Sequence, residues 1–245
     1  MKVGVLGAKG RVGSEICRAV DRATDLRLVA GIGSDDEVDS LALADVVVDF
    51  TRPDAVMDNL RWCLGRGLHC VVGTTGFDEA RLDEVRGLLA DAPGVGVVVA
   101  PNFSVGAALM TRFAVMAAPF YESVEIVELH HPDKADAPSG TSRRTAELVA
   151  AARREAGLEP VPDATVTALE GARGADVEGI HVHSVRSRGL VAHQEVLLGA
   201  AGETLTIRHD SMDRASFVPG VLVAVHAVVA RPGLTLGIEE LLGLD

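Results

Sequence analysis

Aromatic residues and positive charge are both scarce in this sequence, and the two shortages exclude a large class of partners. Phenylalanine, tryptophan and tyrosine make up 3% of the 245 residues, and the net charge at neutral pH is −12. Proteins that bind nucleic acid need a basic surface, and those that bind single strands also need aromatic rings on which bases stack. We therefore expect no nucleic-acid partner. An anionic substrate must then be attracted by a local cluster of positive groups.

Cysteine is also rare, and no apolar run is long enough to span a bilayer. Cys17, Cys63 and Cys70 form no CxxC pair and lie in apolar stretches, so we expect buried, reduced thiols in a cytoplasmic protein. The longest late apolar run, residues 218–230, contains a proline, a glycine and a histidine and predicts a core helix. Two basic residues interrupt the first apolar stretch, which is untypical of a secretory signal. We expect no membrane partner.

The first hundred residues alternate between strand and helix patterns. Short apolar runs rich in valine predict strands at residues 3–6, 26–30, 45–50, 68–72 and 95–100. Helical spacing of apolar residues predicts helices at residues 12–20, 53–64 and 78–89. Strands without polar alternation are typical of a parallel sheet that is covered on both faces. The pattern therefore predicts an α/β fold with a Rossmann-type doubly wound sheet.

The pattern changes after about residue 105, and we place a domain boundary near Ser104. Helices are predicted at residues 105–120 and 140–157, and strands at 124–130, 180–187, 194–198 and 204–209. Consecutive strands without helices between them favour an open, largely antiparallel sheet. The sequence thus predicts a first domain over residues 1–104 and a smaller α+β domain with an open mixed sheet over residues 105–214. The helix at 218–230 can return to the first domain.

A glycine-rich loop follows the first strand and opens a helix. It runs Gly7-Ala8-Lys9-Gly10-Arg11-Val12-Gly13, with the spacing GxxGxxG rather than the more common GxGxxG. Glycines let the backbone approach a pyrophosphate, whose charge the helix N-terminus favours. The alternative is a tight turn without a ligand. Three later strand ends also carry loop-forming residues, where ligands of doubly wound sheets bind: Phe50-Thr51, Gly73–Gly76 and Ala100–Phe103.

A second segment, residues 130–141, concentrates groups that transfer protons. It reads HHPDKADAPSGT, and its Lys134 is one of only three lysines among 23 basic residues. Lysine can donate a proton, which arginine cannot. Ser139, Gly140 and Thr141 precede a predicted helix whose free N–H groups can hold a carboxylate. The segment therefore supplies the local positive cluster, unless it is a solvated loop in which Ser139 only caps the helix.

Other reactive side chains show no pattern of comparable specificity. His181 and His183 are two apart on a predicted strand and face the same side, but no third ligand is evident and we expect no metal. There is no GxSxG motif and no cysteine beside a histidine, so covalent acyl chemistry has no support.

Five motifs together resemble the 4-hydroxy-tetrahydrodipicolinate reductase (dihydrodipicolinate reductase) family. They are GAKGRVG at 7–13, DFT at 49–51, VVGTTGF at 71–77, APNFSVG at 100–106 and ELHHPDKADAPSGT at 128–141. Two later segments, GARGADVEGIHVHSVR and GETLTIRHDSMDRASFVPGV, also resemble that family, especially its actinobacterial members. The histidine–lysine segment is the most specific of these motifs.

The resemblance implies a reductase that uses NADPH or NADH. It would reduce 4-hydroxy-tetrahydrodipicolinate to tetrahydrodipicolinate with loss of water, in the diaminopimelate pathway of lysine biosynthesis. By the same resemblance, His130 would donate and accept a proton and Lys134 would be a second donor. His131, Ser139, Gly140 and Thr141 would bind the dicarboxylate substrate.

Nucleotide contacts are likewise implied by the resemblance. They would come from Gly7, Ala8, Lys9, Gly10, Arg11, Val12, Phe50, Thr51, Gly73, Thr74, Thr75, Ala100, Pro101, Asn102 and Phe103. The family further implies a homotetramer built through the second domain, whose residues 105–214 would bind substrate and tetramerise. It also implies a first domain completed by residues 215–245 and domain closure over the substrate.

Two alternatives stay open at this point. One is another two-domain Rossmann dehydrogenase that uses NAD(P), although such enzymes usually need a reactive cysteine or a different base. The other is a nucleotide-sensing protein without turnover, in which the segment HHPDK would be an idle loop.

Cofactor preference is the point at which the sequence departs from the family. A carboxylate at the end of the second strand usually binds the ribose diol of NAD, but here that position is Gly33, followed by Asp35 and Asp36. Lys9 and Arg11 can pair with the 2′-phosphate of NADPH. We therefore predict that both cofactors are used and that NADPH is at least as good as NADH.

Overall fold

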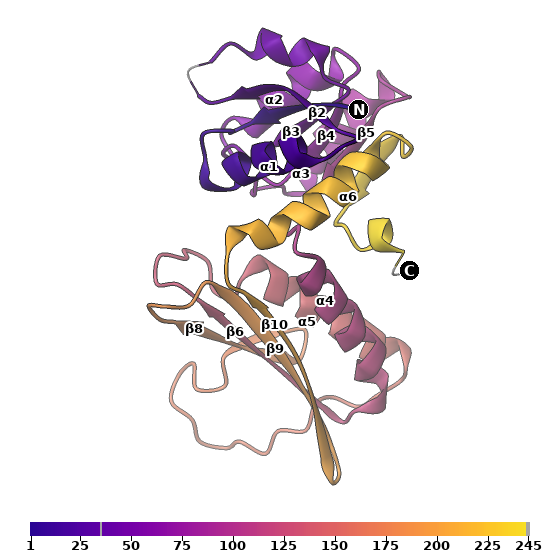
Figure 1. Cartoon of the computed structure of the whole chain (residues 1–245). Coiled ribbons are helices and arrows are strands. Elements are labelled where there is room, and N and C mark those ends of the chain that lie inside the picture. Colours follow the sequence, from indigo (N-terminus) through magenta and orange to yellow (C-terminus); the bar gives the residue numbers. More distant parts are fainter. Residues whose placement is uncertain (35, 244–245) are drawn as a thin grey trace. The chain divides into compact units, whose positions relative to one another are not determined.

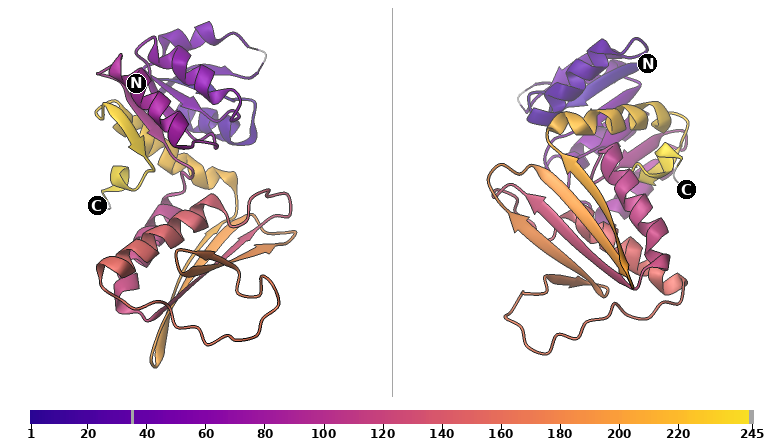
Figure 2. Two further views of the ribbon diagram at one scale, coloured as in Figure 1. Left: turned by 180° about the vertical axis from the view of Figure 1, so that it is seen from behind. Right: turned by 60° about the horizontal axis from the view of Figure 1, so that its bottom comes forward.

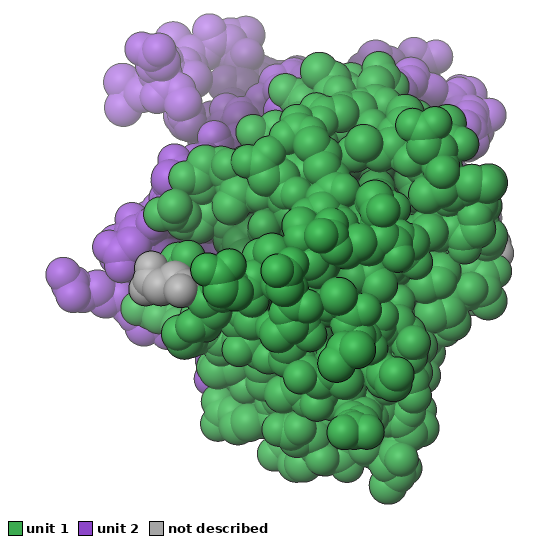
Figure 3. Space-filling view, turned by 90° about the horizontal axis from the view of Figure 1, so that it is seen from above, with its two compact units in different colours: residues 1–105, 214–245 green, residues 106–213 purple. Residues whose placement is uncertain are grey.

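The computed structural model describes residues 1–34 and 36–243, and the chain divides into two compact units (Figures 1 and 2). The first unit contains residues 1–105 and 214–245, and the second contains residues 106–213. Figure 3 colours the two units separately. The C-terminal segment therefore belongs to the same unit as the glycine loop. No helix in the described ranges has the length and apolar composition needed to cross a membrane.

The first unit is built on a six-stranded sheet in which every pair is parallel. Its strands are β1 (Lys2–Leu6), β2 (Arg27–Ile32), β3 (Val46–Asp49), β4 (His69–Val72), β5 (Gly96–Val99) and β11 (Gly233–Leu236). The order is β11-β5-β4-β3-β1-β2. The chain leaves β1 toward β2 and then returns to β3 on the other side of β1. This reversal is the topological switch point beside which doubly wound sheets bind ligands.

Helices cover both faces of this sheet, as the valine-rich strands predict. The helices are α1 (Arg11–Arg22), α2 (Val56–Leu64), α3 (Glu79–Ala90) and α6 (Val218–Val228), with shorter 3-10 helices η1 (Val38–Leu43), η3 (Arg214–Phe217) and η4 (Glu240–Leu242). Helices α1 and α6 contact each other, while α2 contacts α3 and strands β3 and β4. Helix α2 begins three residues later than predicted, because residues 53–55 form a turn.

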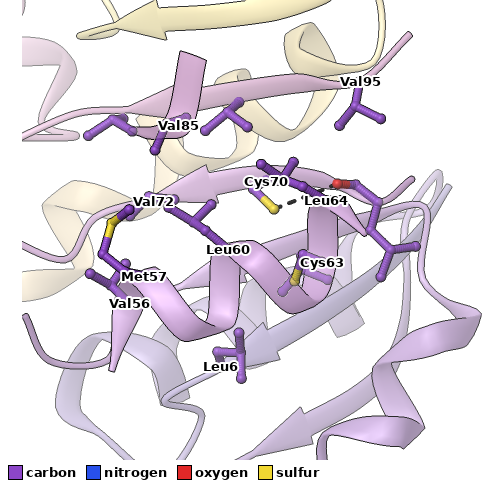
Figure 4. Close-up of a cluster of buried hydrophobic side chains, with 14 of the residues drawn as sticks. Leu6, Val56, Met57, Leu60, Cys63, Leu64, Cys70, Val72, Val85 and Val95 are labelled. Atoms are coloured by element: carbon purple, nitrogen blue, oxygen red, sulfur yellow. Dashed lines mark hydrogen bonds between the residues drawn. The ribbon is translucent and has the colours of Figure 1, made fainter. Parts of the chain in front are cut away.

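Figure 4 shows the apolar core between α2, α3 and the sheet. All four residues of β3 are buried, and Leu60 of α2 is 1% exposed. Cys63 and Cys70 lie in this core as free thiols. Cys17 is also a free thiol but is only half-buried, so the expectation that all three cysteines are buried is wrong for Cys17.

The C-terminal segment enters the first unit through two close contacts. A Cβ at Gly220 of α6 would overlap the carbonyl oxygen of Phe103, so the helix backbone lies directly against the loop that follows β5. Strand β11 then pairs with β5 in parallel, from Gly233 beside Gly96 to Leu236 beside Val99. The sequence did not predict β11, because four residues with no long apolar run acquire strand geometry only by pairing with β5.

The second unit packs two helices against one face of a mixed five-stranded sheet. The helices are α4 (Val105–Ala117) and α5 (Gly140–Glu155), with η2 (Ala118–Phe120) after α4. The strands are β6 (Ser123–His130), β7 (Ala175–Val177), β8 (Ile180–Arg186), β9 (Ala192–Ala200) and β10 (Glu203–Ser211), in the order β10-β9-β6-β8-β7. Only the β6–β8 pair is parallel, so the predicted open mixed sheet is confirmed. Strand β7 was not predicted.

Burial alternates along β6 and separates its two faces. Val124, Ile126 and Glu128 are fully buried in the side of the sheet that packs on α5, whereas the residues between them are half-buried. Side chains two positions apart on a strand point to the same face. The buried set therefore contains one carboxylate, that of Glu128, among otherwise apolar neighbours.

Candidate functional site

The glycine loop of the first unit is packed too closely for side chains at two positions. Gly7 has a φ of +79°, and a Cβ there would overlap the backbone carbonyl of Phe50. A Cβ at Gly13 would overlap the carbonyl oxygen of Gly7. The N–H groups of Gly7 and Ala8 both donate to the carbonyl oxygen of Ile32 at 3.0 Å. The loop is thus held between β1, β2 and β3, with its backbone at the switch point.

Helix α1 starts directly after this loop without a side-chain cap. Its N-cap residue is Gly10, which has no side chain that could accept a hydrogen bond from the first turn. Arg11 is exposed, and Val12 is half-buried. Uncapped N–H groups at a helix start favour an anion, so the local structure suits a bound anion.

Loops that follow β3 and β4 are joined by one buried carboxylate. Asp49 is 3% exposed and accepts hydrogen bonds from the hydroxyls of Thr51 at 2.6 Å and Thr74 at 2.9 Å, and from Asn59 Nδ2 at 2.8 Å. The hydroxyls of Thr51 and Thr74 therefore point inward to Asp49, while Thr75 is exposed. The sequence analysis quoted Asp49 within DFT but missed its role and that of Asn59, since Asn59 and Thr74 are 10 and 25 positions away from Asp49.

Aromatic packing joins the same loops to the one after β5. The ring of Phe50 lies against Gly73, where a Cβ would overlap it, and its centroid is 5.6 Å from that of Phe103. Phe103 and Ala100 are buried, Pro101 is exposed, and Asn102 Oδ1 accepts the N–H of Ser104 at 2.9 Å. The structure therefore brings the predicted strand-end residues of β3, β4 and β5 together within the first unit.

Charges at the end of β2 are paired with each other. Lys9 Nζ donates to Asp36 Oδ1 at 2.9 Å, and Asp36 Oδ2 accepts the N–H of Gly33 at 2.7 Å. These two hydrogen bonds, that from Lys9 foremost, lower the pKa of Asp36 from its ordinary value. The stem of Lys9 lies over Gly33, where a Cβ would meet Lys9 Cδ at 2.7 Å. Asp35 lies outside the described residues.

In the second unit, His130 is hydrogen-bonded to the buried carboxylate of Glu128. His130 Nδ1 lies 2.5 Å from Glu128 Oε2, and Arg186 of β8 donates to both oxygens at 2.9 and 2.8 Å. Burial by itself raises the pKa of Glu128, but hydrogen bonds from His130, Arg186 and Ser184 outweigh it and lower the pKa to about 2. Glu128 is therefore ionised at neutral pH.

Lys134 and the start of α5 meet at one carboxylate, that of Asp136. Lys134 Nζ donates to Asp136 Oδ1 at 2.6 Å, and the N–H of Gly140 donates to Asp136 Oδ2 at 3.2 Å. Burial raises the pKa of Asp136, and the hydrogen bond from Lys134 and the nearby positive charge reverse this and lower it. The start of α5, which the sequence predicts to hold a substrate carboxylate, and the ammonium of Lys134, which it predicts to be a proton donor, are thus close enough to bind one carboxylate together.

The remaining predicted substrate residues differ in exposure. His131 and Thr141 are half-buried, and Gly140 is exposed. Ser139 is 3% exposed, and its hydroxyl caps α5 by accepting the N–H of Ser142 at 3.2 Å. Ser142 makes a further buried hydrogen bond, in which its Oγ donates to Gln194 Oε1 at 2.8 Å. Sequence reasoning missed Glu128 and Arg186, although the spacing of Glu128 and His130 already placed both on one strand face.

Other histidines take part in separate pairs. His183 Nε2 lies 2.5 Å from Glu125 Oε2, and Glu125 is also paired with Arg173. His193 pairs with Asp210, and His226 of α6 pairs with Asp25. Within residues 1–34 and 36–243, no three histidine, cysteine, aspartate or glutamate side chains form a group that could hold a metal ion.

Comparisons with known proteins match the whole length of the chain. The family "Dihydrodipicolinate reductase, N-terminus" matches residues 1–103, and "Dihydrodipicolinate reductase, C-terminus" matches residues 106–242. Proteins named 4-hydroxy-tetrahydrodipicolinate reductase from Cutibacterium acnes and Nocardia farcinica are 64% and 61% identical, over 100% of this chain and 100% and 99% of their own lengths.

Solved structures extend this comparison to the fold. The dipicolinate-bound dihydrodipicolinate reductase from Paenisporosarcina sp. TG-14 has a TM-score of 0.85 and 35% identity, with 98% of each chain covered. A probable dehydrogenase from Thermotoga maritima has a TM-score of 0.66 at 12% identity, over 100% of this chain and 93% of its own, and shows a shared fold only.

Proposed function

Because this chain belongs to the dihydrodipicolinate reductase family, we propose that the clusters described in its two units hold the two reactants of that family's reaction. The chain is an NAD(P)H-dependent oxidoreductase that reduces 4-hydroxy-tetrahydrodipicolinate to tetrahydrodipicolinate with loss of water, in the diaminopimelate route to lysine. We assign the individual residues their roles in binding the two reactants and in proton transfer.

The first unit has the local structure that a dinucleotide requires. Gly7 and Gly13 leave no room for a Cβ, and the first turn of α1 has no side-chain cap in the described residues. We assign the pyrophosphate to Gly7 through Val12 and the nicotinamide end to the loops carrying Phe50, Thr51, Gly73–Thr75 and Ala100–Phe103. When bound, the nicotinamide supplies a hydride.

The loop between β6 and α5 carries the proposal for the substrate. It places His130, Lys134 and the N-terminus of α5 within twelve residues, and Asp136 shows that Lys134 Nζ and the N–H of Gly140 can hold one carboxylate together. A substrate carboxylate would displace that of Asp136 and take these donors, with Thr141 and His131 beside it. His130, in its protonated form, then gives the proton on Nε2 to the substrate, and Lys134 is a second proton donor.

Substitution of the two proton donors tests this assignment. His130→Ala and Lys134→Ala should each lower kcat by about 10²–10⁴-fold, the usual contribution of general acid catalysis, while NADPH still binds with near-normal affinity. His183→Ala is the matched control, since His183 is also paired with a glutamate of β6. Near-normal turnover in both variants would reject the assignment.

We also propose a homotetramer that forms through the second unit, in the cytoplasm, where the reaction draws on the NAD(P)H pool. Its support is the sheet face turned away from α5. There Leu129 lies beside Val185, and Leu197 lies opposite Glu125. Leu197 and Val185 are 37% and 39% exposed. Partly exposed apolar side chains on a sheet face suit contact with a second copy of the same chain.

A further inference from the structure

Glu128 is a buried carboxylate whose acceptor positions are fully used. Its side chain is 0% exposed. Oε2 accepts from His130 Nδ1 at 2.5 Å and from Arg186 Nη1 at 2.9 Å, and Oε1 accepts from Arg186 Nη2 at 2.8 Å and from the N–H of Ser139 at 3.3 Å. A buried charge is tolerated only when it is paired and hydrogen-bonded in this way.

Three separate elements fix the position of this carboxylate. Glu128 is on β6, Arg186 is at the end of the neighbouring strand β8, and Ser139 is the N-cap of α5. Arg186 Nη2 also donates to the carbonyl oxygen of Asp136 at 2.7 Å. The carboxylate is therefore held by groups that also hold the loop containing Lys134.

An ionised carboxylate decides which ring nitrogen of His130 carries hydrogen. It can only accept hydrogen bonds, so His130 Nδ1 must donate, and in the neutral ring Nε2 is then without hydrogen. His130 is 13% exposed in its side chain, and Nε2 is the atom left for the substrate. The opposite tautomer would break the bond to Glu128 and place two acceptors, His130 Nδ1 and Glu128 Oε2, against each other.

We propose that Glu128 is a positioning residue, which holds His130 in the Nδ1–H form with Nε2 directed to the substrate. The proposal rests on the function assigned to His130 above. When His130 gives up its Nε2 proton, the ring returns to the same Nδ1–H form. Glu128 therefore keeps one ring orientation before and after the transfer, without touching the substrate itself.

Histidine NMR on the unsubstituted protein is the first test. With ¹⁵N-labelled histidine, the His130 signal is identified by its absence in a His130→Gln variant. The expected result is neutral His130 with hydrogen on Nδ1. Neutral His130 with hydrogen on Nε2 would overturn the proposal, and this measurement needs no variant of Glu128.

Kinetics of Glu128→Gln form the second test, because glutamine keeps the shape and loses the charge. A glutamine amide can turn to donate to Nδ1, so the tautomer should become mixed. We expect kcat to fall about 10–100-fold while the KM values for both substrates stay within about threefold. Glu128→Asp keeps the charge and should restore the Nδ1–H form and part of the turnover, which also covers the case in which the glutamine variant does not fold.

Glu125→Gln is the matched control. Glu125 is on the same strand and is paired with a histidine and an arginine, His183 and Arg173, on the other face of the sheet. The substitution Glu125→Gln should leave kcat unchanged. If Glu128→Gln lowers thermal stability as Glu125→Gln does but leaves kcat and the tautomer of His130 unchanged, Glu128 has only a structural role. If His130→Ala itself keeps normal turnover, the assigned function of His130 fails instead.

Discussion

Position 33, at the end of β2, is a glycine, whereas NAD-binding proteins usually have a carboxylate there. A nearby carboxylate, that of Asp36, lies close to this position. The carboxylate of Asp36 reaches back to the N–H of Gly33 and to Lys9. A negative charge at the end of β2 is therefore present although position 33 is a glycine. Lys9 is 67% exposed in its side chain, so it can exchange Asp36 for a 2′-phosphate at little cost.

We predict that the enzyme uses both cofactors, with kcat/KM for NADPH at least equal to that for NADH. Asp36→Asn removes the charge that repels a 2′-phosphate and should move the ratio toward NADPH by about 2–5-fold, since exposed charge pairs contribute up to about 1 kcal/mol. Asp39→Asn, an exposed acid three residues later, is the control. A preference for NADH above about tenfold, or roughly 1.4 kcal/mol, would contradict the prediction.

Thr141 offers a second test at a single side chain. Its hydroxyl is assigned to a substrate carboxylate, so Thr141→Val should raise KM for 4-hydroxy-tetrahydrodipicolinate about tenfold or more, the cost of losing a hydrogen bond to a charged group. Thr141→Ser keeps the hydroxyl and should stay near the unsubstituted value. A loss of kcat with an unchanged KM would argue against a simple anchoring role.

Among the elements, α6 depends most clearly on a close backbone approach. The backbone of Gly220 lies against the carbonyl oxygen of Phe103, in the loop assigned to the nicotinamide. Gly87 of α3 is also inside a helix, but nothing lies within 4 Å of the position its Cβ would take. Both glycines therefore lie within helices, but only Gly220 is packed against another backbone segment.

Alanine at these two glycines should have opposite effects on stability. Gly87→Ala should stabilise the protein by up to about 1 kcal/mol, because alanine favours a helix over glycine. Gly220→Ala should destabilise it by roughly 1–3 kcal/mol, because α6 must move away from the loop. Denaturant unfolding measures both. Equal stabilisation by the two substitutions would show that the contact between α6 and the Phe103 loop is not tight.

For the whole molecule, the open face of the second sheet is the feature that bears on assembly. It carries Leu129, Val185 and Leu197 between charged neighbours such as Glu195 and Arg208. A monomer would leave these side chains in water. Partly exposed apolar side chains on a sheet face favour burial against an identical surface.

The proposed assembly predicts that sedimentation shows a tetramer for the unsubstituted protein. Leu197→Asp places a charge in the centre of this face and should shift the protein to smaller species without unfolding it. Leu43→Asp, at a 68% exposed site in the first unit, should leave the tetramer intact. A monomeric unsubstituted protein would contradict the proposed assembly.

Local sequence patterns predicted a large part of this protein. Continuous valine runs predicted β1, β3, β4 and β5, because strands covered on both faces need apolar residues throughout. The spacing of Gly7, Gly10 and Gly13 predicted a loop that helix α1 follows, and the segment from His130 to Thr141 predicted the start of α5. That this segment also supplies the proton donors stays a prediction. In each case the signal lies within about a dozen consecutive residues.

Only the tertiary structure decided how distant residues combine. Arg186 is 58 positions from Glu128 and meets it because β8 pairs in parallel with β6. Asp49 joins Thr74, 25 positions away, because β3 and β4 end at the same edge of the sheet. Strand β11 exists because β5 offers it an edge. The register of strand pairs and the packing of one element on another depend on residues that are far apart in the sequence, so no local pattern of residues predicts them.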